Sequence, residues 1–183
     1  KAQVVDGDSP YCIDFDNQQA TSDALGYLVA NHVIRKALHE QVTTLSSVKV
    51  ISGMSADAVH TDDHIATVRL SNGETISARL LVAADSRFSE TRRRMGISAD
   101  MHDFGRVAIV CRMEHELAND GTAFECFHYG RTLAVLPLSD NLSSIVITAA
   151  TDVAEEILGM DEELLNADIR QRFHNRLGGM KLT

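Results

Sequence analysis

The stretch LLVAADSRFSETRRRMGI, residues 80–97, carries most of the information about the fold. Residues 80–84 are continuously apolar, which is typical of a strand in a parallel sheet that helices cover on both faces. Asp85 follows at once, so we expect its carboxylate at the carboxyl end of that strand, where open α/β sheets bind their ligands. Residues 89–95 then predict a short helix that ends at Gly96.

Ser89 and Arg92 follow Asp85 at a spacing that places them one helical turn apart. A helix N-terminus with an arginine nearby favours anionic groups such as a pyrophosphate, because free backbone N–H groups and the helix dipole attract negative charge. Each residue also has a plainer interpretation. Asp85 would cap the helix, Ser89 would start it locally, and Arg92 would be a solvated helix residue. The residues alone leave both interpretations open.

The sequence before this stretch predicts a helix and a small antiparallel sheet. Apolar residues recur at helical spacing over 31–41, and Asn31 stands where an N-cap belongs. The pair Asn72-Gly73 is typical of a tight hairpin turn, with positive φ expected at both positions. Strands are expected over residues 48–51, 55–60, 65–70 and 75–84.

After Gly96 the pattern changes to short alternating strands joined by short turns, which predicts an antiparallel meander. Helices close the chain, and Asp152 and Glu155 have the spacing of a capping box. Three aromatic side chains in this part either line a substrate pocket or belong to the core, and the core is the commoner role for a strand face. They are Phe124, Phe127 and Tyr129.

Composition narrows the classes of function. The net charge of −9 over 183 residues makes nucleic acid an unexpected partner, because an acidic protein repels phosphate backbones. The three cysteines form no CxxC pair, which favours a reduced, cytoplasmic setting. No apolar run reaches the length of a membrane span. No histidine pair has zinc-protease spacing, so no metal site is expected, and no GxGxxG turn is present.

Residues 80–97 resemble the second flavin motif of the p-hydroxybenzoate-hydroxylase-like monooxygenases, which is an apolar strand followed by Asp-Gly and Ser-x-x-Arg. Asp85, Ser89 and Arg92 match it, whereas Ser86 stands where the family usually has Gly. A serine fits there without strain when its φ is negative. The resemblance implies that Asp85 and Arg92 lie near the FAD pyrophosphate, that Ser89 supports the turn, and that NAD(P)H is used.

Two further segments are similar to the ubiquinone-pathway hydroxylases of this family. Residues 26–38 resemble their Asn-x-x-[Leu/Ile]-x-x-Ala-Leu segment, whose first residue lies near the ribityl-phosphate part of the flavin. This implies a cofactor contact for Asn31, with Arg35 as a second candidate on the same helix. Residues 104–148 resemble the substrate-domain sheet, through GTA at 121–123, LPL at 136–138 and the strand at 143–146.

The resemblance implies a mixed α/β fold: part of a p-hydroxybenzoate-hydroxylase-like FAD domain plus an antiparallel-sheet substrate domain. Residues 1–20 would open the substrate domain, residues 21–96 would belong to the FAD domain, and residues 97–183 would form the rest of the substrate domain. The chain would be an internal fragment, because the family's glycine-rich phosphate turn and its later Gly-Asp motif are missing from it. The fragment alone is therefore expected to bind FAD weakly or not at all and to be inactive.

The function that the resemblance implies is hydroxylation of a polyprenylated phenolic ring in ubiquinone biosynthesis, with FAD, NAD(P)H and O₂. The sequence singles out no catalytic base. The protein would contact a membrane surface through partner proteins, or it would belong to a multi-enzyme complex. Two alternatives stay open: a flavin hydroxylase of the same fold that acts on another aromatic compound, and a non-catalytic interaction module built on residues 97–183.

Overall fold

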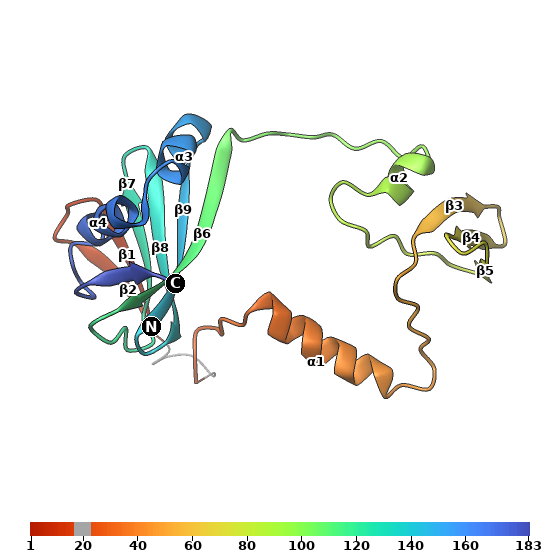
Figure 1. Ribbon diagram of the computed structural model, residues 1–183, viewed down its shortest axis with the longest axis horizontal. Coiled ribbons are helices and arrows are strands. Elements are labelled where there is room, and N and C mark those ends of the chain that lie inside the picture. Colours follow the sequence, from red (N-terminus) through yellow and green to blue (C-terminus); the bar gives the residue numbers. More distant parts are fainter. Residues whose placement is uncertain (17–22) are drawn as a thin grey trace. The chain divides into compact units, whose positions relative to one another are not determined.

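The computed structural model describes residues 1–16 and 23–183. The chain divides into two compact units, and the smaller consists of residues 35–102. The larger unit combines residues 1–34 with residues 103–183 (Figure 1). That these units represent an FAD-binding part and a substrate-binding part stays a prediction.

The described part of the larger unit contains a seven-stranded sheet in the order β10-β6-β9-β8-β7-β1-β2. Neighbouring strands pair antiparallel, except that β1 and β7 run parallel. The predicted mixed α/β fold with an antiparallel sheet is confirmed, and the first strand of the chain joins that sheet. The strands are β1 (Ala2–Asp6), β2 (Cys12–Phe15), β6 (Arg106–His115), β7 (Ala123–His128), β8 (Arg131–Ser139), β9 (Leu142–Ala150) and β10 (Met180–Leu182).

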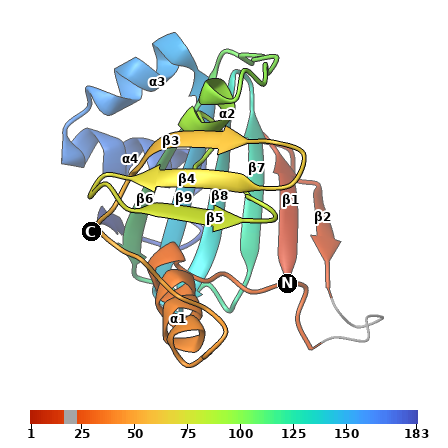
Figure 2. The ribbon, with the colours of Figure 1, turned by 90° about the vertical axis from the view of Figure 1, so that its right-hand side faces the viewer.

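Two helices, α3 (Thr151–Leu158) and α4 (Glu162–Arg172), pack on one face of this sheet and enclose the core (Figures 1 and 2). Strand β9 alternates between buried and half-buried residues, as a strand with one face in a core does. Phe124 meets Phe173 edge to face, with ring centroids 5.0 Å apart, so Phe124 belongs to the core. Burial of each such large apolar side chain contributes about 1.5–3 kcal/mol.

A buried charge cluster joins α4 to β8. The side chain of Arg131 is 5% exposed and forms an ion pair with Asp168. Asp168 also accepts a hydrogen bond from Nε of Arg172, one turn further along α4, at 3.0 Å. Burial lowers the pKa of Arg131, and Asp168 acts against that change by favouring the charged guanidinium. The cluster therefore depends on Asp168 to compensate a charge that is out of water.

The smaller unit contains a three-stranded antiparallel sheet in its described residues, in the order β3-β4-β5. The turn between β4 and β5 differs from the expected one, because only Gly73 has a positive φ, +85°. The Gly73 N–H donates to the carbonyl of Leu70 at 2.9 Å, and the side chain of Asn72 accepts from the N–H of Glu74 at 3.0 Å. A type I turn followed by a left-handed glycine thus replaces the two-residue turn. The strands are β3 (Ala56–Thr61), β4 (Ala66–Leu70) and β5 (Thr75–Ala78).

The strand expected over residues 75–84 ends at Ala78, and the prediction of a buried strand at 80–84 is wrong. Leu80 and Val82 are 77% and 75% exposed. A strand of a parallel sheet needs hydrogen-bonding neighbours and covering helices, and the described residues supply neither for this segment. Asp85 therefore follows an unpaired segment instead of lying at the rim of a parallel sheet. The strand expected over 48–51 is absent for the same reason.

The helix α1 (Asn31–Thr43) lies where helical periodicity predicted one, but the expected caps differ. The carbonyl of Ala30 accepts the first helical N–H bonds, so Asn31 is the first helical residue and not the N-cap. The capping box expected at Asp152 and Glu155 is also wrong, because β9 runs directly into α3 and the cap falls on Ala150. Among the described helices, none has the length and apolar character needed to cross a bilayer.

Candidate cofactor-binding segment

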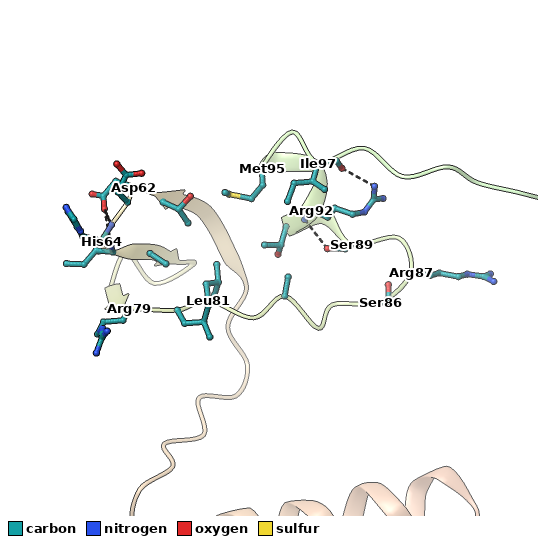
Figure 3. Close-up of a pocket in the computed structure, with 17 residues that line it drawn as sticks. Asp62, His64, Arg79, Leu81, Ser86, Arg87, Ser89, Arg92, Met95 and Ile97 are labelled. Atoms are coloured by element: carbon teal, nitrogen blue, oxygen red, sulfur yellow. Dashed lines mark hydrogen bonds between the residues drawn. The ribbon is translucent and has the colours of Figure 1, made fainter.

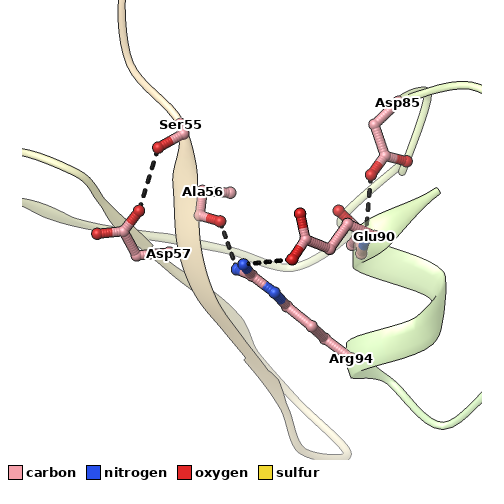
Figure 4. Close-up of polar contacts among 7 residues, drawn as sticks. Ser55, Ala56, Asp57, Asp85, Glu90 and Arg94 are labelled. Atoms are coloured by element: carbon pink, nitrogen blue, oxygen red, sulfur yellow. Dashed lines mark hydrogen bonds and ion pairs between the residues drawn. The ribbon is translucent and has the colours of Figure 1, made fainter.

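Ser89 is the N-cap of the short helix α2 (Glu90–Arg94), and the carboxylate of Asp85 accepts hydrogen bonds from the same helix start. One oxygen accepts a hydrogen bond from the Ser89 hydroxyl at 2.5 Å, and the other accepts from the backbone N–H of Thr91 at 3.0 Å. The Ser89 hydroxyl oxygen in turn accepts from the N–H of Arg92 at 3.0 Å. Figure 4 shows Asp85 beside the N-terminus of this helix. Local polar contacts thus fix the segment from 85 to 92.

These contacts act on the charge of Asp85. The Ser89 hydroxyl, and after it the N–H of Thr91, hold the pKa of the Asp85 carboxyl well below its usual range, because both donate to the ionised form. The carboxylate is therefore charged at neutral pH. A fixed negative charge at this place is suited to accepting hydrogen bonds from hydroxyl groups and N–H groups.

Ser86 adopts a backbone conformation that glycine normally supplies. Its φ is +89°, whereas a strain-free serine at this position would need a negative φ. The Ser86 carbonyl accepts from the N–H of Ser89 at 3.1 Å, and its hydroxyl accepts from the N–H of Phe88 at 3.3 Å. The condition for a strain-free serine is thus not met, and the turn has the positive φ that glycine normally supplies although the residue is serine.

The arginines around α2 have different partners. Arg94 donates to the carbonyl of Ala56 at 2.6 Å and pairs with Glu90 at 2.9 Å, which ties α2 to strand β3 (Figure 4). Arg92 donates to the carbonyl of Ile97 at 3.1 Å, just beyond the helix. One guanidinium group therefore anchors the helix, and the other closes the turn that follows it.

A cavity of about 630 Å³ lies within the smaller unit, next to this segment (Figure 3). Ser86, Ser89 and Arg92 line it, and Asp85 does not. Its wall combines apolar side chains with guanidinium groups and hydroxyls, a mixture typical of small-molecule sites. The remaining lining residues are Thr61, Asp62, Asp63, His64, Ile65, Ala66, Arg79, Leu80, Leu81, Ala83, Arg87, Thr91, Met95 and Ile97.

The structure brings Asp85, Ser89 and Arg92 together, as their spacing predicted. Asn31 and Arg35 lie one turn apart on α1, and their sharing of a site with Asp85 stays a prediction. Sequence reasoning did not identify Thr91. Its contribution is a backbone N–H, which nearly every residue type has, so the sequence does not distinguish it. In residues 1–16 and 23–183, no group of His, Cys, Asp and Glu side chains is placed to hold a metal ion.

Known proteins share both the sequence and the fold of this chain, although no family model matches it. It is 46% identical over 99% of its length to ubiquinone hydroxylase UbiM of Neisseria meningitidis, of which it covers 40%. It is 32% identical over 98% of its length to ubiquinone hydroxylase UbiL of Rhodospirillum rubrum, of which it covers 42%. The chain thus spans about two-fifths of the length of these curated relatives.

The solved structure of PqsL from Pseudomonas aeruginosa, described as a probable FAD-dependent monooxygenase, matches the whole chain with a TM-score of 0.75. The chain covers 54% of that structure, and the sequences are 19% identical, so this match shows the fold alone. The chain is thus similar in sequence to ubiquinone hydroxylases over nearly all of its own length, and it has the fold of a probable FAD-dependent monooxygenase.

Proposed function

We propose that the protein containing this chain is an FAD-dependent monooxygenase that hydroxylates a polyprenylated phenolic ring in ubiquinone biosynthesis. NAD(P)H supplies two electrons, one oxygen atom of O₂ enters the ring as a hydroxyl group, and the other leaves as water. The observation that carries this proposal is sequence similarity to ubiquinone hydroxylases over nearly the whole of this chain, together with a capped Asp85–Ser89–Arg92 segment that resembles a flavin motif.

The residues of this chain fit part of what FAD requires. The Ser86 backbone has the glycine-like φ that a close approach of a phosphate needs, and Arg92 places positive charge at the adjoining cavity. Asp85 is held in its charged form and suits a hydroxyl or N–H donor of the cofactor. The glycine-rich turn that grips a dinucleotide pyrophosphate does not occur in this sequence, so these residues would hold FAD together with others.

FAD, when bound, supplies the redox and oxygen chemistry, and the protein binds, orients and excludes water. In that division of work, Asp85, Ser89 and Arg92 are binding residues, and Asn31 and Arg35 are proposed to contact the same cofactor from α1. No proton transfer needs to be assigned to any of them. The protein would work in the cytoplasm and reach its membrane-dissolved substrate through an apolar contact or a partner protein, since a net charge of −9 opposes electrostatic docking to anionic lipid.

The test is turnover by the full-length protein with FAD, NAD(P)H, isotopically labelled O₂ and a polyprenylated phenol. The proposal predicts one labelled oxygen atom in the ring of the product. The test also includes a panel of other aromatic compounds. A hydroxylase of the same fold that acts on one of them would form labelled product from that compound and not from the polyprenylated phenol. An interaction module would bind no flavin and yield no product with any of them.

A further inference from the structure

One carboxylate interrupts an apolar row on the face of the large sheet that α3 and α4 do not cover. Glu125 of β7 lies opposite Val4 of β1 on one side and Ala134 of β8 on the other. The row continues through Val146 of β9 to Val110 of β6. Because side chains alternate between the two faces of a strand, Glu125 points away from the core that Phe124 and Cys126 join.

The position of Glu125 is unfavourable for a charge. Its side chain is half-buried and forms no hydrogen bond or ion pair with any other residue in the described part of the chain. Burial raises the pKa of its carboxyl, since the charged form loses hydration without gaining a partner. The Glu125 carboxylate is therefore free to accept a hydrogen bond from a ligand, and such a bond would compensate its partial loss of hydration.

A cavity of about 340 Å³ opens on the same face, one row away. Ala123, two residues before Glu125 on β7, lines it together with Ala2 of β1 and Leu136 of β8. Ala2 pairs with Ala123, and Leu136 lies two residues from Ala134, the partner of Glu125, so all three residues are on the face that carries Glu125. Two residues along a strand span about 7 Å, so a ligand the size of a substituted ring reaches from the cavity to the carboxylate. The segment from Ala24 to Leu28 forms the apolar outer wall.

We infer that Glu125 and this cavity form a subsite for an alkylated phenol, with the carboxylate accepting a hydrogen bond from the phenolic hydroxyl and the cavity holding the apolar substituent. The choice of a phenol rests on the proposed function. Phe127, on the same strand and face and 46% exposed, offers an aromatic surface beside the ring.

The test is equilibrium binding to the flavin-loaded full-length protein without NAD(P)H, so that no turnover occurs. The probes are 2-prenylphenol and its O-methyl ether, which has the same shape and no hydroxyl donor. Glu125→Leu is expected to weaken phenol binding about tenfold or more and to leave ether binding within about twofold. Glu125→Gln, which keeps an oxygen acceptor, should lose less. Glu114 of β6 is exposed and lies on the same face of the sheet as Glu125. Glu114→Leu should change neither affinity.

Ala123→Leu tests the cavity itself, and it should weaken binding of both probes because the added side chain occupies the space that the alkyl group needs. The inference is overturned if Glu125→Leu affects phenol and ether equally, or if Ala123→Leu affects neither. Selective phenol binding without any hydroxylated product would leave this subsite standing and refute the proposed function. Hydroxylated product without selective phenol binding would support the proposed function and refute this subsite.

Discussion

The hydroxyl group of Ser89 donates to the carboxylate of Asp85 at 2.5 Å and accepts from the backbone N–H of Arg92 at 3.0 Å. The buried hydroxyl of Ser89 thus links the two other residues, Asp85 and Arg92, that match the second flavin motif. The same contacts serve as a helix cap, so capping and cofactor binding are compatible roles for Asp85. A cap fixes the carboxylate before any ligand arrives, and a prearranged group loses less conformational freedom on binding.

Ser89→Ala should weaken this arrangement. It removes both hydrogen bonds of the hydroxyl, and loss of an N-cap typically costs about 1 kcal/mol. Asp85 has a lowered pKa, so its charged form stabilises the fold above its ordinary value of 3.8, and that contribution is lost as the pH falls through the lower folded pKa. The measurement is amide hydrogen exchange across residues 90–95, with exposed Ser98→Ala as the control. Unchanged protection in Ser89→Ala would contradict the cap.

Ser86→Gly should stabilise the protein. A non-glycine residue at a φ of +89° costs about 1–2 kcal/mol, and glycine removes that cost while losing some entropy on folding. The expected net gain is about 0.5–1 kcal/mol in the free energy of unfolding, measured by urea denaturation. Ser77→Gly, at an exposed position within β5, is the matched control and should lower stability. A loss of stability in Ser86→Gly would show that the positive φ is not strained.

Asp168→Ala should be strongly destabilising. It leaves the guanidinium of Arg131 buried without its ion-pair partner, and breaking a buried pair in this way costs about 3–5 kcal/mol. Exposed Glu163→Ala on the same helix should cost less than about 0.5 kcal/mol. Thermal unfolding followed by circular dichroism distinguishes the two variants. Equal unfolding temperatures would mean that Arg131 finds water or another acceptor.

Glu125→Gln should raise stability at neutral pH in the absence of ligand. The pKa of Glu125 is raised in the folded state, so its protonated form stabilises the fold at low pH, and this contribution is lost as the pH rises through the folded pKa. Glutamine is uncharged at every pH and avoids that loss. The stability difference between variant and wild type should therefore grow from pH 4 to pH 7. A difference that does not change with pH would contradict the raised pKa.

Local features of the fold could be predicted from the sequence. The helix at 90–94 was predictable because Ser89, Arg92 and Gly96 lie within about two helical turns of one another. The strands β6 and β9 were predictable because their alternation records which face is buried. Two helix caps and one hairpin turn were predicted wrongly at the local level, but the mistake with the largest effect concerns interactions between distant residues. The apolar run at 80–84 reads as a buried strand, but pairing depends on neighbours that the described chain does not provide.

The same distinction between local and long-range interactions applies to the residues of the candidate sites. Asp85, Ser89 and Arg92 are close in sequence and their contacts follow from spacing. Glu125 was missed because a single glutamate between Phe124 and Cys126 reads as an ordinary outward-facing residue of an alternating strand. Only the pairing with Val4 and Ala134 shows that it stands alone in an apolar row. The pairing with Val4 depends on a parallel contact between β1 and β7. These strands are far apart in the sequence, so no local pattern predicts the contact.

The most direct test of the central claim, that the segment from 85 to 92 binds flavin, is the ratio of FAD to protein after purification of the full-length protein and its Asp85→Ala variant with added FAD. The account predicts close to one FAD per wild-type chain and a clearly lower ratio in Asp85→Ala. Equal flavin content in the two proteins would contradict it.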